Sequence, residues 1–236
     1  MNFMKQLYFP FLYLTRLFYP KLCLACEKNP PSPNSCLCTH CDYRITHTNY
    51  HTMIQNPVLE RFWGRVALEH ASSSYVFSKG GRLQNLIHKL KYEGQPEIGI
   101  ELGKRFGSLL KNTAPYDTVT NIVPVPLHPK KEKIRGYNQA AMFAQGLAEG
   151  MNKPWSENYL IRVENTTTQT QKSRMDRFDN VANAFAVAQT KELAHQHILL
   201  VDDVITTGAT LEACAHKLLA VEGVKVSLAV IALAST

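Results

Sequence analysis

The feature that most constrains this chain is the run ILLVDDVITTGAT, which extends from Ile198 to Thr210. Four apolar residues lead to two adjacent acids, Asp202 and Asp203, and two more apolar residues precede a loop of threonine and glycine. An uninterrupted β-prone run is typical of a strand buried in a parallel sheet. Ligands of open parallel sheets bind beyond the carboxyl ends of the strands. The pattern therefore predicts a ligand site beside the two acids.

The loop after this strand has the chemistry that a phosphate group requires. It consists of Thr206, Thr207, Gly208, Ala209 and Thr210, and a helix-forming stretch follows it directly. Backbone N–H groups, hydroxyls and the positive end of a helix dipole all favour a dianionic phosphate. Gly208 lets the backbone wrap closely, because glycine tolerates positive φ. The preceding carboxylates suit the vicinal hydroxyls of a sugar instead. The alternative is an ordinary turn with a coincidental pair of acids.

Strand-like and helix-like segments alternate along the chain. Short β-prone runs occur at 75–77, 119–125, 198–201 and 226–233, and apolar residues recur at helical spacing in 83–90, 97–110, 137–148 and 211–218. This alternation predicts an α/β fold with a parallel sheet and right-handed crossovers. Cys214 falls on the apolar face of the last helix and is expected to be a core residue.

Five of the six cysteines lie between positions 23 and 41. Two CxxC pairs, Cys23 with Cys26 and Cys38 with Cys41, have the spacing of a structural zinc site, in which four thiolates leave no open position for water. Cys36 is an alternative ligand to Cys38, although it lacks the two-residue spacing, and free or redox-active thiols are the alternative to a metal. The clustering argues against a secreted disulfide framework and favours a reducing cytosol.

The first 20 residues are apolar but interrupted. Pro10, Arg16 and Pro20 break the run, whereas a spanning helix needs about 20 continuous apolar residues. We expect a short amphipathic helix that docks on the protein or on a partner. Peripheral contact with a membrane surface is the less favoured alternative.

A second candidate anion site lies in the segment VPVPLHPKKEKIRGYNQA, from Val123 to Ala140. Four cations fall together in what we expect to be a loop between a strand and a helix: Lys130, Lys131, Lys133 and Arg135. The net charge of +7 arises from the first three quarters of the chain, which includes this loop. Such a cluster of cations can hold a pyrophosphate group.

The run from Ile198 to Thr210 resembles the motif of type I phosphoribosyltransferases that binds 5-phosphoribosyl pyrophosphate (PRPP). From about Leu22 onward, the chain resembles the ComF family of competence-associated proteins. The motifs that carry this resemblance, in order, are the four-cysteine ribbon, VPVPLH followed by RGYNQ, Thr166-x-x-Gln169, Arg177-x-x-Asn180, Asn183 to Phe185, and the PRPP motif. The chain departs from the family pattern at Lys172, where members commonly have an apolar residue, and in the lysines that replace arginines of the basic loop.

The resemblance implies a role for each part of the site. Asp202 and Asp203 would bind the ribose 2′ and 3′ hydroxyls, and the loop 206–210 would hold the 5′-phosphate. The basic loop would stabilise the departing pyrophosphate, and Mg²⁺ would accompany PRPP near the two acids. Residues 164–179, with Gln169 and Arg177, resemble the hood that closes over PRPP in this fold, and a plain surface loop is the alternative.

The expected organisation is an amphipathic segment at 1–20, a zinc ribbon at 21–45, a connector at 46–70 and a phosphoribosyltransferase-like domain at 71–236. The resemblance implies a cytoplasmic PRPP-binding protein associated with DNA uptake, transformation or the use of DNA as a nutrient. If it is an enzyme, it is a Mg²⁺-dependent phosphoribosyltransferase whose acceptor the sequence does not name. The alternative is a non-catalytic, PRPP-responsive adaptor that binds single-stranded DNA or a helicase.

Overall fold

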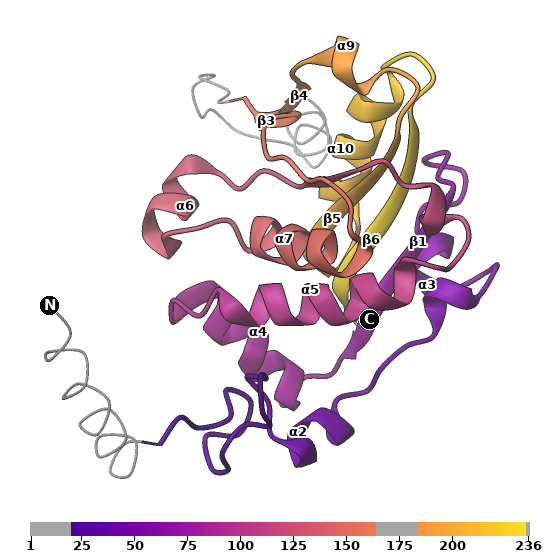
Figure 1. Ribbon diagram of the computed structural model, residues 1–236. Coiled ribbons are helices and arrows are strands. Elements are labelled where there is room, and N and C mark those ends of the chain that lie inside the picture. The colour runs from indigo at the N-terminus through magenta and orange to yellow at the C-terminus, as the bar shows by residue number, and fades with distance from the viewer. Residues whose placement is uncertain (1–19, 164–183, 235–236) are drawn as a thin grey trace, which may run out of the picture.

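A parallel sheet lies at the centre of the computed structural model, which describes residues 20–163 and 184–234. Its strand order is β1 (His70–Phe77), β6 (Lys225–Ala234), β5 (His197–Ile205) and β2 (Asn121–Pro124), and every neighbouring pair is parallel (Figure 1). The predicted α/β class with a parallel sheet is therefore confirmed. Strand β2 is shorter than the predicted run 119–125.

Helices cover both faces of this sheet. On one face lie α4 (Arg82–Tyr92), α5 (Glu97–Leu110) and α7 (Gln139–Met151), and on the other lie α3 (Pro57–Glu60) and α10 (Ala209–Leu219) (Figure 1). The central strands β5 and β6 are largely apolar because both of their faces are covered. In β5, Leu199 and Val201 join the core under α7, whereas Ile198 and Leu200 join the core under α10. Cys214 is fully buried in that second core, as predicted.

Glycines set the distance between α5 and α7. A Cβ atom at Gly103 would collide with the carbonyl oxygen of Phe143, and one at Gly146 would collide with that of Ile100. The two helix backbones therefore approach more closely than side chains would permit. Apolar periodicity predicted both helices, but it did not reveal this contact.

A small antiparallel pair lies beyond β2. It consists of β3 (Leu160–Arg162) and β4 (Phe185–Val187), and the short helix α9 (Thr190–Leu193) leads from it to β5. These two strands flank the expected hood. Gln169 and Arg177, the hood residues named from the sequence, lie outside the described residues.

The N-terminal ribbon packs on the helices of the first face. It ends in α2 (Thr39–Arg44), and its buried residues Cys23, Leu37 and Cys41 belong to the same apolar cluster as α4 and α5. The connector that follows contains the turn η1 (Tyr50–Thr52) and α3, and a further turn, η2 (Tyr116–Thr118), precedes β2. The ribbon and the sheet domain thus share one core.

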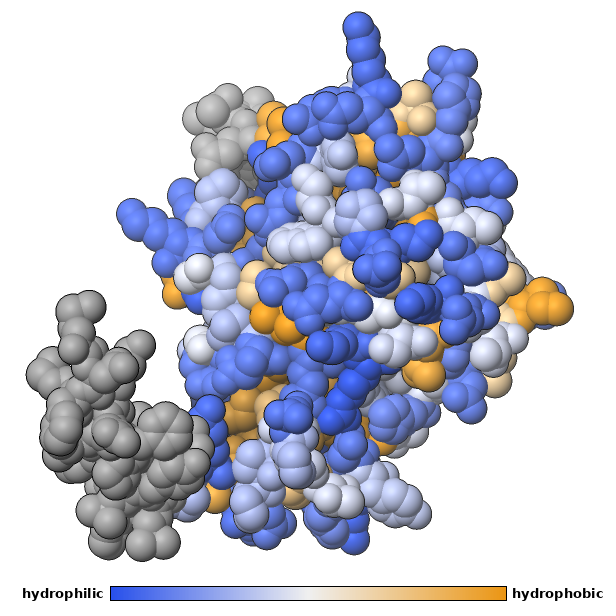
Figure 2. All heavy atoms as spheres, in the orientation of Figure 1, coloured by the Kyte–Doolittle hydropathy of each residue, from blue (hydrophilic) through white to orange (hydrophobic). Residues whose placement is uncertain are grey.

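Hydrophilic side chains cover most of the face seen in Figure 2, with apolar side chains scattered among them. Within the described ranges, no helix has the length and apolar character needed to cross a membrane.

Candidate functional site

Asp202 and Asp203 lie near the carboxyl end of β5. The strand continues to Ile205, so the acids belong to the ladder, and Asp202 is paired with Val230 of β6. Each carboxylate is oriented by a backbone N–H group: Asp203 N donates to Asp202 Oδ1 at 2.8 Å, and Val204 N donates to Asp203 Oδ1 at 2.5 Å. Both side chains remain partly exposed at the edge of the sheet where ligands bind.

The two acids have different electrostatic surroundings. Burial, together with the neighbouring charge of Asp203, raises the pKa of Asp202 to about 7, and the charge of Lys91 opposes this shift. Asp203 has a direct cationic partner, because Lys91 Nζ lies 3.0 Å from its Oδ2. Lys91 belongs to α4, which comes from another layer of the fold, and the sequence motif did not indicate it.

The loop after β5 has the geometry of a phosphate cradle. Gly208 takes a φ of +81°, as expected for a glycine that turns the backbone, and α10 begins at the next residue. The first turn of a helix leaves its N–H groups without partners inside the helix. A hollow of about 50 Å³ is lined by Asp202 and by residues 204–211, so the predicted acid and the predicted loop share one small pocket.

The connector at 46–70 packs against this loop and its neighbours. The ring of Phe62 lies under Gly208, where a Cβ atom would be only 3.0 Å from Phe62 Cζ. Arg65 pairs with Glu212 in the first turn of α10, with Nε 3.2 Å from Oε1 and a second, shorter contact between Nη2 and Oε2. Arg61 Nη2 donates to the carbonyl oxygen of Ala234 at 2.9 Å. The sequence pattern indicated only a connector at 46–70 and did not reveal these contacts.

The cations at 130–135 lie on a helix and not on the predicted loop. Helix α6 (Pro129–Arg135) begins at a proline whose preceding His128 accepts a hydrogen bond from Lys130 N, and it ends at Gly136 with a φ of +82°. Lys130, Lys131 and Lys133 are exposed. The segment starts just after β2, and Pro124 of β2 is paired with Val201 of β5, so α6 follows the same edge of the sheet as the acids.

The carboxyl end of α4 is joined to this basic segment. The Arg135 guanidinium lies over the ring of Tyr92 at 5.3 Å, and Tyr137 Oη donates to the carbonyl oxygen of Leu90 at 2.6 Å. Arg135 also donates to the side chain of Gln139. These contacts fix the last turn of α4, which carries Lys91, in a position between the two acids and α6.

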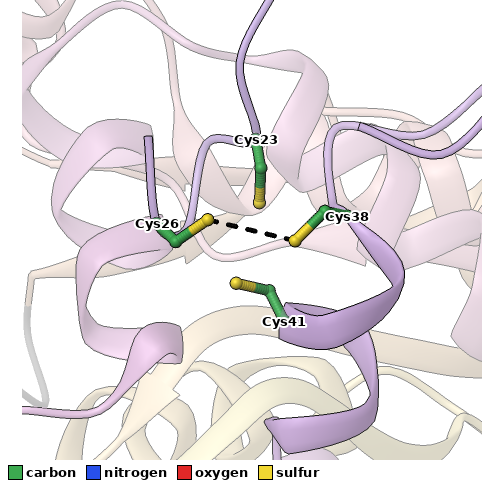
Figure 3. Close-up of side chains that lie close together, drawn as sticks. All are labelled: Cys23, Cys26, Cys38 and Cys41. Carbon is green, nitrogen blue, oxygen red and sulfur yellow. Dashed lines mark hydrogen bonds between the residues drawn. The ribbon is translucent and has the colours of Figure 1, made fainter. Parts of the chain in front are cut away.

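The four predicted cysteines converge on one point (Figure 3). The sulfurs of Cys23, Cys26, Cys38 and Cys41 all lie within 4.8 Å of one another, and Cys26 Sγ is 3.9 Å from Cys38 Sγ. A tetrahedral site with metal–sulfur bonds of about 2.3 Å requires sulfurs about 3.8 Å apart. The cluster therefore fits a metal ion such as zinc.

Local hydrogen bonds order the second knuckle and place donors next to sulfur atoms of the cluster. Cys41 N donates to the carbonyl oxygen of Cys38 at 3.0 Å within the second knuckle, and Arg82 Nε donates to Cys41 Sγ at 3.2 Å. The backbone N–H of Lys28 is the main cause that lowers the pKa of the Cys26 thiol, to about 6. Donors that face sulfur stabilise its ionised, metal-binding form.

Cys36 is not part of the cluster. Its backbone N–H donates to Glu101 of α5, and burial together with the nearby Glu101 charge raises the pKa of its thiol. Of the two candidates left open by the sequence, the structure places Cys38 with the other ligands.

A family model described as the phosphoribosyl transferase domain matches residues 138–235. Among curated proteins, "Competence protein F" of Haemophilus influenzae is 30% identical over 203 residues, which is 82% of this chain and 89% of that protein. "DNA utilization protein YhgH" of Escherichia coli K12 is 30% identical and covers 84% of each chain. "Competence protein ComFC" of Bacillus subtilis is 27% identical over 84% of this chain and 78% of that protein.

Two solved structures show weaker likeness. The glutamine PRPP amidotransferase of B. subtilis aligns with a TM-score of 0.40 at 18% identity, over 60% of this chain and 30% of that one. The adenine phosphoribosyltransferase of Leishmania tarentolae aligns with a TM-score of 0.36 at 15% identity, over 57% of this chain and 56% of that one.

Proposed function

This chain belongs to the family of competence protein F and the DNA utilization proteins, and on that premise we propose that it binds PRPP at the carboxyl edge of its sheet. The observation that carries the proposal is the shared pocket of Asp202 and the loop 206–210 at the start of α10. Acceptors for sugar hydroxyls and donors for a phosphate lie side by side there, as a phosphorylated pentose requires.

Each part of the ligand has a chemical counterpart in this arrangement. Ribose hydroxyls donate to the carboxylates of Asp202 and Asp203, and the 5′-phosphate accepts from the N–H groups of the loop 206–210. The diphosphate faces the cations of α6, namely Lys130, Lys131, Lys133 and Arg135. We assign Gln169 and Arg177, by family resemblance, to a hood over the ligand. A zinc ion held by the four thiolates of the cysteine cluster would have a structural role, because four thiolates leave no open coordination position.

The carboxylates also fit the oxygen-rich surroundings that Mg²⁺ prefers. Bound with PRPP, Mg²⁺ would neutralise charge on the diphosphate. The chain's own residues orient the ribose and exclude water from its anomeric carbon. In a transfer reaction, the bond from that carbon to the diphosphate oxygen breaks and the diphosphate leaves with the electron pair. An amine or nucleobase nitrogen forms the new bond and loses its proton to water or to the departing diphosphate.

We further propose that this chemistry serves DNA uptake or the use of DNA as a nutrient, in the cytoplasm, where thiols stay reduced. The second candidate is a non-catalytic, PRPP-responsive adaptor that contacts single-stranded DNA or a helicase. One observation favours it: Tyr92 is 63% exposed and Arg135 lies over its ring, next to the exposed lysines of α6. Aromatic rings beside cations can stack on bases.

Calorimetric titration with PRPP and Mg²⁺ tests the ligand assignment. We expect the Asp202→Asn/Asp203→Asn variant to bind about 30-fold more weakly, or about 2 kcal/mol, because the hydroxyls lose charged acceptors. Asp117→Asn is the matched control, since Asp117 is exposed and precedes β2, at the opposite end of the strand. Equal affinities of the double variant and the wild type would remove the acids from the site.

Two further measurements separate the candidate functions. Release of pyrophosphate from PRPP in the presence of an amine or nucleobase supports the transferase. Affinity for single-stranded DNA that falls steeply with salt and responds to PRPP, without pyrophosphate release, supports the adaptor.

A further inference from the structure

Lys91 is a cation of the sugar site that comes from outside the sequence motif. Its Nζ lies 3.0 Å from Asp203 Oδ2, and the two side chains are 22% and 13% exposed. Both side chains are therefore mostly buried, and each keeps some exposure to solvent. Lysine carries three N–H donors, and one contact with a carboxylate leaves donors for other groups.

The position of Lys91 is set by its neighbours. It lies in the last turn of α4, between Leu90, whose carbonyl oxygen accepts from Tyr137 Oη, and Tyr92, whose ring lies against Arg135. The segment that begins α7 and the end of α6 thus hold this turn against the edge of the sheet. A lysine fixed in this way loses less side-chain freedom when it binds a ligand.

The chemistry of PRPP then indicates which group Lys91 faces. The diphosphate is attached to the anomeric carbon, directly beside the carbon that bears the 2′ hydroxyl. A cation in contact with the acid that binds the ribose hydroxyls is therefore within reach of the diphosphate. When a hydroxyl donates to Asp203, it competes with the ammonium for the carboxylate and leaves the ammonium available to a new anion.

We propose that Lys91 binds the diphosphate group of PRPP and exchanges its ion pair with Asp203 for this contact when the ribose occupies the site. The inference rests on the proposed function and deepens it, because it adds a diphosphate ligand outside the basic helix α6. The competing role is purely structural, in which Lys91 neutralises Asp203 and never touches the ligand. The two roles predict that a substitution of Lys91 weakens the binding of different parts of PRPP.

The test compares three ligands in the presence of Mg²⁺: PRPP, inorganic pyrophosphate and ribose 5-phosphate, which lacks the diphosphate. For Lys91→Gln we expect affinity for PRPP and pyrophosphate to fall at least about tenfold, and affinity for ribose 5-phosphate to change less than about threefold. Lys91→Arg should restore most of the diphosphate binding, because it keeps the charge. Lys104→Gln, which removes an exposed lysine paired with Glu149, is the control and should match the wild type.

Each outcome decides the point. Equal losses for PRPP and ribose 5-phosphate, or no loss for PRPP, would overturn the diphosphate role. A wild type that binds neither sugar phosphate would overturn the proposed function itself, and the inference with it. Circular dichroism and thermal unfolding of each variant check the fold, and a Lys91→Arg protein that folds normally but fails to bind pyrophosphate also counts against the proposal.

Discussion

Arg82 and Lys91 stand at opposite ends of helix α4, and each contacts a different candidate site. Arg82 Nε donates to Cys41 Sγ at 3.2 Å in the cysteine cluster, and Lys91 Nζ lies 3.0 Å from Asp203 Oδ2 in the proposed sugar site. At a rise of about 1.5 Å per residue, the nine steps from Arg82 to Lys91 span about 14 Å. One helix therefore connects the candidate metal centre to the proposed PRPP site.

Metal analysis should find one zinc ion per chain, because four convergent thiols complete a tetrahedral sphere. We expect Cys38→Ser to lose the metal and Cys36→Ser to retain it, since Cys36 lies outside the cluster. Elemental analysis of the purified variants measures this. The reverse result would assign Cys36 as the ligand.

Removal of zinc should weaken PRPP binding through α4. Without the metal, the thiols no longer hold the ribbon against Arg82, so we expect faster amide hydrogen exchange in residues 82–92 and a several-fold loss of PRPP affinity. Chelation followed by exchange mass spectrometry and calorimetry tests this, and readdition of zinc is the control. Metal-free protein that stays folded with unchanged exchange in α4 would contradict a structural role for the metal.

Gly208→Ala should destabilise the protein and weaken phosphate binding. The new methyl group would meet Phe62 at 3.0 Å, and the backbone at +81° is strained for alanine, at a cost of about 1 to 3 kcal/mol. Gly80→Ala is a matched control, because Gly80 has a φ of +75° with nothing within 4 Å of the added atom. Chemical denaturation measures both. Equal losses in the two variants would show that Phe62 does not restrict the loop.

Arg65→Gln should reduce affinity for PRPP several-fold, because it leaves the Glu212 carboxylate unpaired in the first turn of α10, close to the expected phosphate. Glu212→Gln in the same protein should restore binding by removing that charge. A double-mutant cycle by calorimetry gives the coupling. Additive effects of the two substitutions would exclude this electrostatic role.

PRPP affinity should increase with pH through the titration of Asp202. Its pKa is raised to about 7, chiefly by burial. In the proposed complex, ribose hydroxyls donate to the ionised carboxylate. Binding should therefore strengthen from about pH 6 to about pH 8 and then level off. In the free protein, the same raised pKa makes the free energy of unfolding fall as pH rises from the ordinary aspartate value towards 7.

The phosphates of PRPP also titrate, so the informative comparison is with Asp202→Asn. That variant should show only the part of the pH dependence that belongs to the ligand. Identical pH profiles for the two proteins would argue against the role of Asp202.

Local sequence patterns were sufficient for most elements of the fold. The helix 97–110 was predicted with its observed bounds, and the strand at 198–201 was predicted but extends to Ile205. The basic segment was predicted wrongly as a loop, although Pro129 and Gly136 are ordinary signals for the start and end of a helix.

The sequence predicted the features that depend on residues a few positions apart. These are the two acids before the proposed phosphate loop, the positive φ at Gly208 and the two cysteine knuckles. Lys91 and Arg65 could not be found in this way. Lys91 meets an acid 112 positions later, and Arg65 meets one 147 positions later. Such pairs arise only when layers of the fold pack together, because no local periodicity records which helix end will face which strand.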